Sequence, residues 1–339
     1  MTRSGSSASI SPGWSDLFPH LAATTLLDPS RGACWTAGVI LLFFLAATLR
    51  ISVPYTLAAL GAAITERGGV VNIALEGMML NGALAYVLAA DLTGDAWAGV
   101  AAAVAAGLAT AALHALVTVV ARADQITSGL GINLLAAGLT KFVLTRVYHS
   151  SSNSPRVVGL PDWDLAGLAA VPGIGPVLGT PLVPITVALV LGGQWLLFRS
   201  VFGLRLRSVG ERPEAAATLG LSVAAHRTLG VLVSGALAGL AGAWLASEQH
   251  SFTDGMTGGR GYIALAAMIV GKWSPLGAAL ACLLFGAAEA LQITLQGSGF
   301  PSELLQMLPY LVTMLALAGF IGRAVAPKAS GVPYDPEVA

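Results

Sequence analysis

The chain has 339 residues, of which 55% are hydrophobic and only 10% are charged. A typical soluble domain carries about 25% charged residues, so 17 acidic and 17 basic side chains are too few to cover a soluble protein of this length. The net charge of zero also excludes the excess of basic residues that is typical of nucleic-acid-binding proteins. The composition instead predicts an all-α polytopic membrane protein, because helices satisfy their own backbone groups in lipid.

Ten apolar segments follow one another along the chain, and a helix needs about 20 apolar residues to cross a bilayer. We predict spans or partial spans at 33–49, 52–65, 70–90, 96–121, 127–148, 181–199, 226–247, 261–272, 275–296 and 302–321. The segments 52–65 and 261–272 are short, and each lies beside a glycine-rich stretch. Such interrupted segments are typical of broken helices that line a cavity.

The distribution of arginine and lysine in the loops predicts the orientation of the spans. The connection 200–225 lies in the most basic part of the chain, so we expect it in the cytoplasm. The loop 149–180 holds only Arg156 and is expected outside. Arg50 fits poorly, because this topology places it between two spans on the outer side. The basic cluster consists of Arg199, Arg205, Arg207, Arg212 and Arg227.

These assignments divide the chain into three parts. A cytoplasmic N-terminal tail is expected at 1–31, a transmembrane domain at 32–322 and a cytoplasmic C-terminal tail at 323–339. Ten crossings place both ends of the chain on the same side.

A short internal similarity suggests that the domain has two related halves. Residues 72–79, NIALEGMM, resemble residues 262–269, YIALAAMI, and both copies follow glycines. The predicted topology runs the two copies in opposite directions, which is the inverted repeat common in transporters. Chance is the alternative, since Ala, Ile, Leu and Met match often in membrane helices.

Polar side chains inside predicted spans are candidates for a transport pathway, because they usually face the bundle interior or a wet cavity. Asn72 and Glu76 are four residues apart and would share one helical face beside the Gly68-Gly69 break. The alternative is that they bond helices together. Asn133, two residues past Gly131, is a further candidate.

The second half offers three more candidates for the pathway. Glu289 and Gln292 are three apart and could line a cavity there. Tyr262 lies at the start of the second repeat copy and could stack on a base or sugar. Because Tyr and Trp also anchor helices at the membrane interface, the role of Tyr262 stays open. The pair Gly235 and Gly239 forms a close-packing surface for a helix of this chain or of a partner.

The basic connection contains signals for a short surface helix. Pro213 can begin it, Glu214 is favourable in its first turn, and Gly220 can end it. A separate protein could grip such a helix, although an ordinary solvated loop is the alternative.

Motifs for nucleotide binding and catalysis are missing from the sequence. No G-x-x-x-x-G-K-[ST] phosphate loop occurs; the nearest approach, Gly271-Lys272, has Ala266 where the first glycine is needed. There is no HExxH metal motif and no GxSxG nucleophile motif. We therefore expect that the chain is not an enzyme and holds no cofactor.

Two motifs resemble a known family. Residues 66–79, ERGGVVNIALEGMM, and residues 203–216, GLRLRSVGERPEAA followed by Leu219-Gly220, are similar to ABC-transporter permeases of the ribose, nucleoside and branched-chain amino-acid group. Residues 66–79 most resemble the nucleoside or simple-sugar branch of this group, and residues 261–278, GYIALAAMIVGKWSPLGA, are similar to the same branch. The resemblance covers about residues 50–322.

The resemblance implies a permease subunit in the cell inner (plasma) membrane that forms a pathway for nucleosides or simple sugars. It also implies a cytoplasmic ATPase that binds ATP-Mg, a second homologous permease and an extracellular or periplasmic substrate-binding protein. The family's coupling region maps onto Gly210, Glu214, Ala215, Ala216 and Gly220. A self-sufficient secondary transporter or channel is the alternative, because inverted repeats and intramembrane acids also fit that class.

Overall fold

The computed structural model describes residues 33–163, 179–296, 301–316, 318 and 325–335. Across these residues the regular structure is helical, and one isolated bridge joins Asn153 to Thr253. The all-α prediction is confirmed for this part of the chain. The expected tail at 1–31 and the middle of the 149–180 loop, at 164–178, lie outside the described residues.

Six of the predicted spans are present as helices close to their expected bounds. They are α3 (Leu75–Thr93), α4 (Ala96–Ala115) with its π-helical continuation η1 (Leu116–Val120), α5 (Gln125–Tyr148), α7 (Leu182–Arg199), α10 (Val223–Gln249) and α12 (Pro275–Leu295).

The first two predicted spans are a single helix, α2 (Ala33–Arg67). Arg50 does not end the helix, and its guanidinium forms an ion pair with Glu248 near the C-terminal end of α10. Pro54 also lies inside the helix without ending it. The prediction of an outer loop around Arg50 was therefore wrong.

The last predicted segments are short or divided. Helix α11 (Arg260–Val270) has 11 residues, too few to cross a bilayer alone. Segment 302–321 contains α13 (Ser302–Gln306) and α14 (Leu308–Leu315), and its end lies outside the described residues. Within the described ranges, seven helices are long and apolar enough to span a membrane. The chain is thus a multi-pass membrane protein, and a count of ten crossings is not established.

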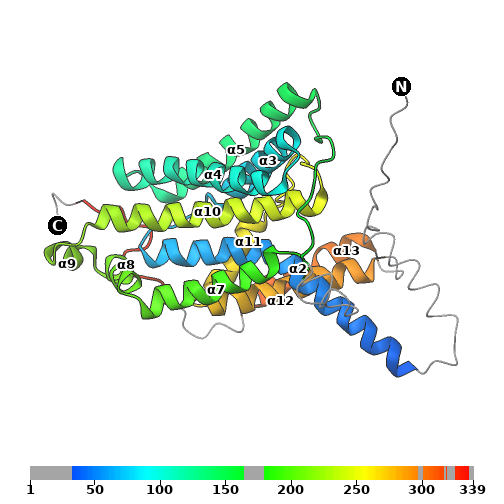
Figure 1. Cartoon of the computed structure of the whole chain (residues 1–339). Coiled ribbons are helices and arrows are strands. Elements are labelled where there is room, and N and C mark those ends of the chain that lie inside the picture. The colour runs from blue at the N-terminus through cyan, green and yellow to red at the C-terminus, as the bar shows by residue number, and fades with distance from the viewer. Residues whose placement is uncertain (1–32, 164–178, 297–300, 317, 319–324, 336–339) are drawn as a thin grey trace. The chain divides into compact units, whose positions relative to one another are not determined.

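Helix α10 packs against α3 and α4 on one side and α2 on the other (Figure 1). Small residues allow the helix backbones to approach closely. A Cβ on Gly82 would stand 2.7 Å from Cα of Gly239, and one on Gly107 would stand 2.1 Å from the carbonyl oxygen of Gly235. The predicted surface at Gly235 and Gly239 is therefore used within this chain.

The basic connection is more ordered than a loop. It contains α8 (Val201–Glu211), which Ser200 caps, and α9 (Pro213–Thr218). Helix α9 lies beyond the end where α10 begins, and α8 lies beside that end (Figure 1). The described part of the 149–180 loop meets the other end of α10, where the backbone N–H of Val157 donates to the carbonyl of His250. The two connections therefore lie at opposite ends of the bundle.

We expect Gly107→Ala to destabilise the fold, because its methyl group would overlap the Gly235 carbonyl. Overpacking of this kind costs about 1–3 kcal/mol. Thermal unfolding in detergent should show a lower midpoint than that of the unmodified protein.

Gly131→Ala on α5 is the matched control, since no atom lies within 4 Å of the added methyl group. An equal midpoint for the two variants would contradict close α4–α10 packing as a source of stability.

Candidate translocation pathway and coupling surface

Two helices begin next to each other inside the bundle. The chain between α2 and α3 turns at Gly69, where φ is 86°, and α11 follows Gly259, where φ is 83°. Glycine adopts this left-handed region without steric cost. The two positions are 190 residues apart, which is the offset of the predicted repeat. The two glycines share a conformation, but Gly69 follows the end of α2, six residues before α3, whereas Gly259 immediately precedes α11.

Glu76 on α3 caps the start of α11. Its Oε1 accepts a hydrogen bond from the N–H of Gly259 at 2.8 Å, and its Oε2 accepts one from the N–H of Gly261 at 2.7 Å. A Cβ on Gly261 would stand 2.6 Å from the backbone nitrogen of Glu76, so the two helix starts touch. The first N–H groups of a helix carry partial positive charge. A carboxylate therefore suits this position, since it lies beside two such ends.

Asn133 on α5 caps the start of α3 in the same way. Its Oδ1 accepts from the N–H of Gly77 at 2.8 Å, and its Nδ2 donates to the carbonyl of Ile73 at 2.9 Å. Nδ2 also donates to the hydroxyl oxygen of Tyr262 on α11, at 2.9 Å. The residue preceding each helix provides no side-chain cap. Side chains from other helices therefore provide the capping bonds.

We call Glu76, Asn133 and Tyr262 the junction cluster. All three were predicted as pathway residues, and the structure brings them together. Tyr262 is 43% exposed, and the other two are partly buried, so the cluster reaches the surface of the chain. Its accessible groups are an aromatic ring, a phenol, an amide and a carboxylate.

Asn72 does not join the junction cluster. It is fully buried, and its Nδ2 donates to the hydroxyl of Ser234 on α10 at 2.9 Å. The prediction that Asn72 and Glu76 share a helical face was wrong, because α3 begins only at Leu75. Asn72 lies in the non-helical segment 68–74 between α2 and α3, which we call the break. Outside a helix, residues four apart do not lie on one face.

Glu289 on α12 belongs to a second polar contact set, beside the start of α11. Its Oε1 pairs with Arg260 at 2.7 Å, and its Oε2 accepts from the hydroxyl of Tyr55 on α2 at 2.5 Å. These contacts hold three helices together. Gln292 is half-buried on the same helix, and no hydrogen bond to its side chain is found among the described residues. Arg260 was not singled out from the sequence, although an arginine at the start of a span requires an acidic partner.

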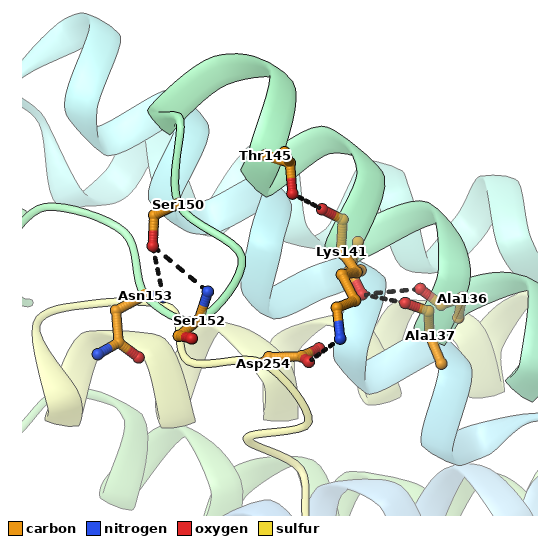
Figure 2. A network of polar contacts seen from close by, with 9 residues as sticks. Ala136, Ala137, Lys141, Thr145, Ser150, Ser152, Asn153 and Asp254 are labelled. Atoms are coloured by element: carbon orange, nitrogen blue, oxygen red, sulfur yellow. Dashed lines mark hydrogen bonds and ion pairs between the residues drawn. The ribbon is translucent and has the colours of Figure 1, made fainter.

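The end of α5 and the loop after α10 are joined at the end of the bundle away from α9. Lys141 pairs with Asp254 at 3.4 Å, and the hydroxyl of Ser150 accepts from the backbone N–H groups of Ser152 and Asn153 (Figure 2). The backbone N–H of Asp254 donates to the carbonyl of Ser152 at 2.8 Å. The described part of the long loop is therefore tied to the segment that leads into α11.

The predicted short helix in the basic connection is present as α9. Pro213 begins it, Glu214 lies in its first turn, and Gly220 follows it with φ of 78°. Between α8 and α9 is an open hollow of about 260 Å³. Its lining residues are Ser208, Glu211, Arg212, Ala215, Ala216 and Leu219.

The candidate coupling residues divide into two groups by exposure. Glu214, Ala215 and Gly220 are exposed and accessible to another protein. Gly210 and Ala216 are buried: a Cβ on Gly210 would stand 2.1 Å from the carbonyl oxygen of Arg67. The buried pair can therefore act only by holding α8 and α9 in place.

The family described as "Branched-chain amino acid transport system / permease component" matches residues 44–317. The chain belongs to this family. It is the membrane-spanning permease component of a transport system, and it is not an enzyme.

Relatives match this permease over most of its length. It is 41% identical to the guanosine ABC transporter permease protein NupQ of Bacillus subtilis, over 87% of this chain and 97% of that one. It is 41% identical to the nucleoside ABC transporter permease protein NupC of Lactococcus lactis, over 84% and 93%. It is 36% identical to a putative glucose ABC transporter permease protein, TsgC13, of Haloferax volcanii, over 74% and 77%. No solved structure matches the chain.

We expect Glu76→Gln to destabilise the permease, because the amide NH2 that replaces one carboxylate oxygen cannot accept, so one of the two N–H groups at the start of α11 loses its acceptor. Hydrogen bonds to charged groups contribute roughly 1.5–3 kcal/mol each, and a loss of about 2 kcal/mol in the free energy of unfolding is expected. Chemical denaturation in detergent measures it.

Glu303→Gln is the control, since Glu303 is an exposed carboxylate in the first turn of α13. Unfolding free energies that fall equally in both variants would refute the capping role of Glu76.

Proposed function

We propose that this permease forms the pathway of an ATP-driven importer that carries nucleosides across the cell inner membrane. The observation that carries the proposal is 41% identity, over nearly their whole length, to permeases named for guanosine and nucleoside transport. The similarity to a putative glucose permease is lower and covers less of the chain, which makes simple sugars the second candidate.

The chemistry of the junction cluster suits a nucleoside. A nucleoside has a flat base with donor and acceptor edges and a ribose with hydroxyl groups. The exposed ring of Tyr262 can stack on the base, and its hydroxyl, which accepts from Asn133, still has a proton to donate. Both Nδ2 hydrogens of Asn133 are used within the chain, so this amide positions Tyr262. Since both oxygens of Glu76 are occupied at the start of α11, this carboxylate shapes the site rather than binding the ribose.

A second permease would complete the pathway. Helix α5 is the least buried of the seven spans, with 22% of its apolar window covered. It nevertheless carries two polar residues, Asn133 and Lys141. The side chain of Lys141 is 58% exposed. Charged groups in a span face protein or a wet cavity rather than lipid. This polar edge therefore supports a homologous partner chain that faces α5 across a water-filled path.

The two ends of the bundle would serve two other partners. A cytoplasmic ATPase with its ATP-Mg would grip α9 at Glu214, Ala215 and Leu219, of which Leu219 is 82% exposed. A substrate-binding protein would deliver the nucleoside at the opposite end, near the 149–163 segment. The C-terminal segment beside α9 would then be cytoplasmic. Helix α2 runs from the opposite end of the bundle, at Arg50, to the α8 end, at Arg67, so the cytoplasmic position predicted for residues 1–31 does not follow from this arrangement. The shared conformation of Gly69 and Gly259, which are 190 residues apart, supports the inverted-repeat arrangement.

Uptake by the reconstituted importer tests the substrate. Vesicles containing the permease, its partner permease and ATPase should accumulate labelled guanosine when ATP and the binding protein are supplied. Excess unlabelled nucleosides should compete, whereas glucose and leucine should not.

We expect Tyr262→Ala to raise the KM for guanosine about tenfold, as the loss of one base-stacking contact of ~1–3 kcal/mol predicts.

Tyr262→Phe keeps the ring and should retain most of the uptake. Strong competition by glucose but not by nucleosides would replace the proposed substrate with a sugar. An unchanged KM in Tyr262→Ala would remove Tyr262 from the pathway.

We expect Glu214→Arg to abolish uptake while leaving insertion of the chain in the membrane intact. The reversed charge would oppose the dipole at the start of α9 and would change the exposed surface offered to the ATPase. Uptake and the amount of membrane-inserted protein are the two measurements.

Glu214→Gln removes the charge without reversing it and should have a smaller effect. Normal uptake in Glu214→Arg would count against α9 as the coupling helix.

A further inference from the structure

The described C-terminal segment, 325–335, folds back against the end of the bundle that carries α8 and α9. The backbone N–H of Ala329 donates to the carbonyl of Gly210 on α8 at 2.9 Å. The guanidinium of Arg227 on α10 donates to the carbonyl of Val332 at 3.0 Å. We call this segment the C-terminal strap.

The strap is anchored on two further elements near its end. Asp335 pairs with Arg122, in the turn between η1 and α5, at 2.7 Å. Tyr334 packs against a small apolar cluster made by Val209 of α8, Ala216 of α9 and Val223 of α10. The strap therefore packs on the cluster at which α8, α9 and α10 meet.

The strap also contacts the break before α3. The carbonyl oxygen of Ala329 lies 3.2 Å from the position that a Cβ on Gly69 would occupy. A Cβ on Gly331 would lie 3.7 Å from a methyl carbon of Val71. The break leads within a few residues to Glu76, so the strap joins α9 to the segment that positions the junction cluster.

Arg227 holds the middle of the strap at an energetic cost. It is 3% exposed, and its Nε and Nη2 have no hydrogen-bond partner among the described residues. A buried guanidinium is unfavourable unless its donors are bonded. The bond from Arg227 to the carbonyl of Val332 is therefore a specific feature of this end of the bundle.

We infer that the C-terminal strap clamps α8, α9 and the α2–α3 break into one body, so that movement of α9 reaches the junction cluster. The inference rests on the proposed function, in which an ATPase moves α9. Helix α8 already touches the break, since a Cβ on Gly210 would stand 3.1 Å from the backbone nitrogen of Gly69. The strap adds a second link, from the break to the cluster that contains Ala216 of α9, and Tyr334 and Asp335 are its positioning residues.

The test is the number of nucleosides imported per ATP hydrolysed by the complete importer in vesicles. Tyr334→Ala should lower this ratio at least about fivefold while ATP hydrolysis continues. Fivefold is the smallest factor typical of coupling between two sites. Tyr334→Phe keeps the packed ring and should restore the ratio. Val325→Ala, at a side chain that is 76% exposed, is the matched control and should leave it unchanged.

Tyr334→Ala could lower the amount of assembled complex instead of the ratio. In that case, exchanging the charges of Arg122 and Asp335 provides the test. Asp335→Arg alone should lower the ratio, and the double variant Arg122→Glu with Asp335→Arg should recover it. If Tyr334→Ala assembles and imports as many nucleosides per ATP as the unmodified importer, the clamp is overturned and the proposed function stands. If Tyr334→Ala does not assemble, the same result in Asp335→Arg has the same meaning. A wild-type importer that takes up no nucleoside would overturn the proposed function and the clamp with it.

Discussion

The arrangement of this permease depends on two helix starts that meet inside the bundle. The first N–H groups of α3 and α11 need acceptors, and within a membrane water is scarce. Glu76 and Asn133 supply these acceptors from neighbouring helices. Because each cap comes from a different helix than the one it caps, α3, α5 and α11 are held in a fixed relation, and that relation creates the polar junction cluster.

The same arrangement explains why the junction can serve transport. Broken helices expose polar backbone where they line a cavity, and here the break coincides with the exposed ring of Tyr262. The rest of the bundle is packed for rigidity, with glycine contacts between α10 and its neighbours. A stiff frame that surrounds one polar, interrupted region is suited to directing a movement to that region.

The two ends of the bundle differ in their contacts, and α10 connects them. At one end, α8, α9 and the C-terminal strap converge on the α2–α3 break. At the other end, the 149–163 segment and Lys141 are tied to the loop that enters α11. Each end is thus linked to one of the two helix starts, and the junction cluster lies between these links.

The sequence by itself determined the membrane class, six of the spans, the short helix α9 and the permease family, because hydropathy, capping residues and motifs act over a few neighbouring positions. It also named all three residues of the junction cluster. Only the tertiary structure decided that α2 is continuous through Arg50, that Asn72 faces Ser234 rather than joining Glu76, and that Arg260 pairs with Glu289. Those outcomes depend on partners about 30 to 200 positions away in the chain, and local patterns carry no information on such partners.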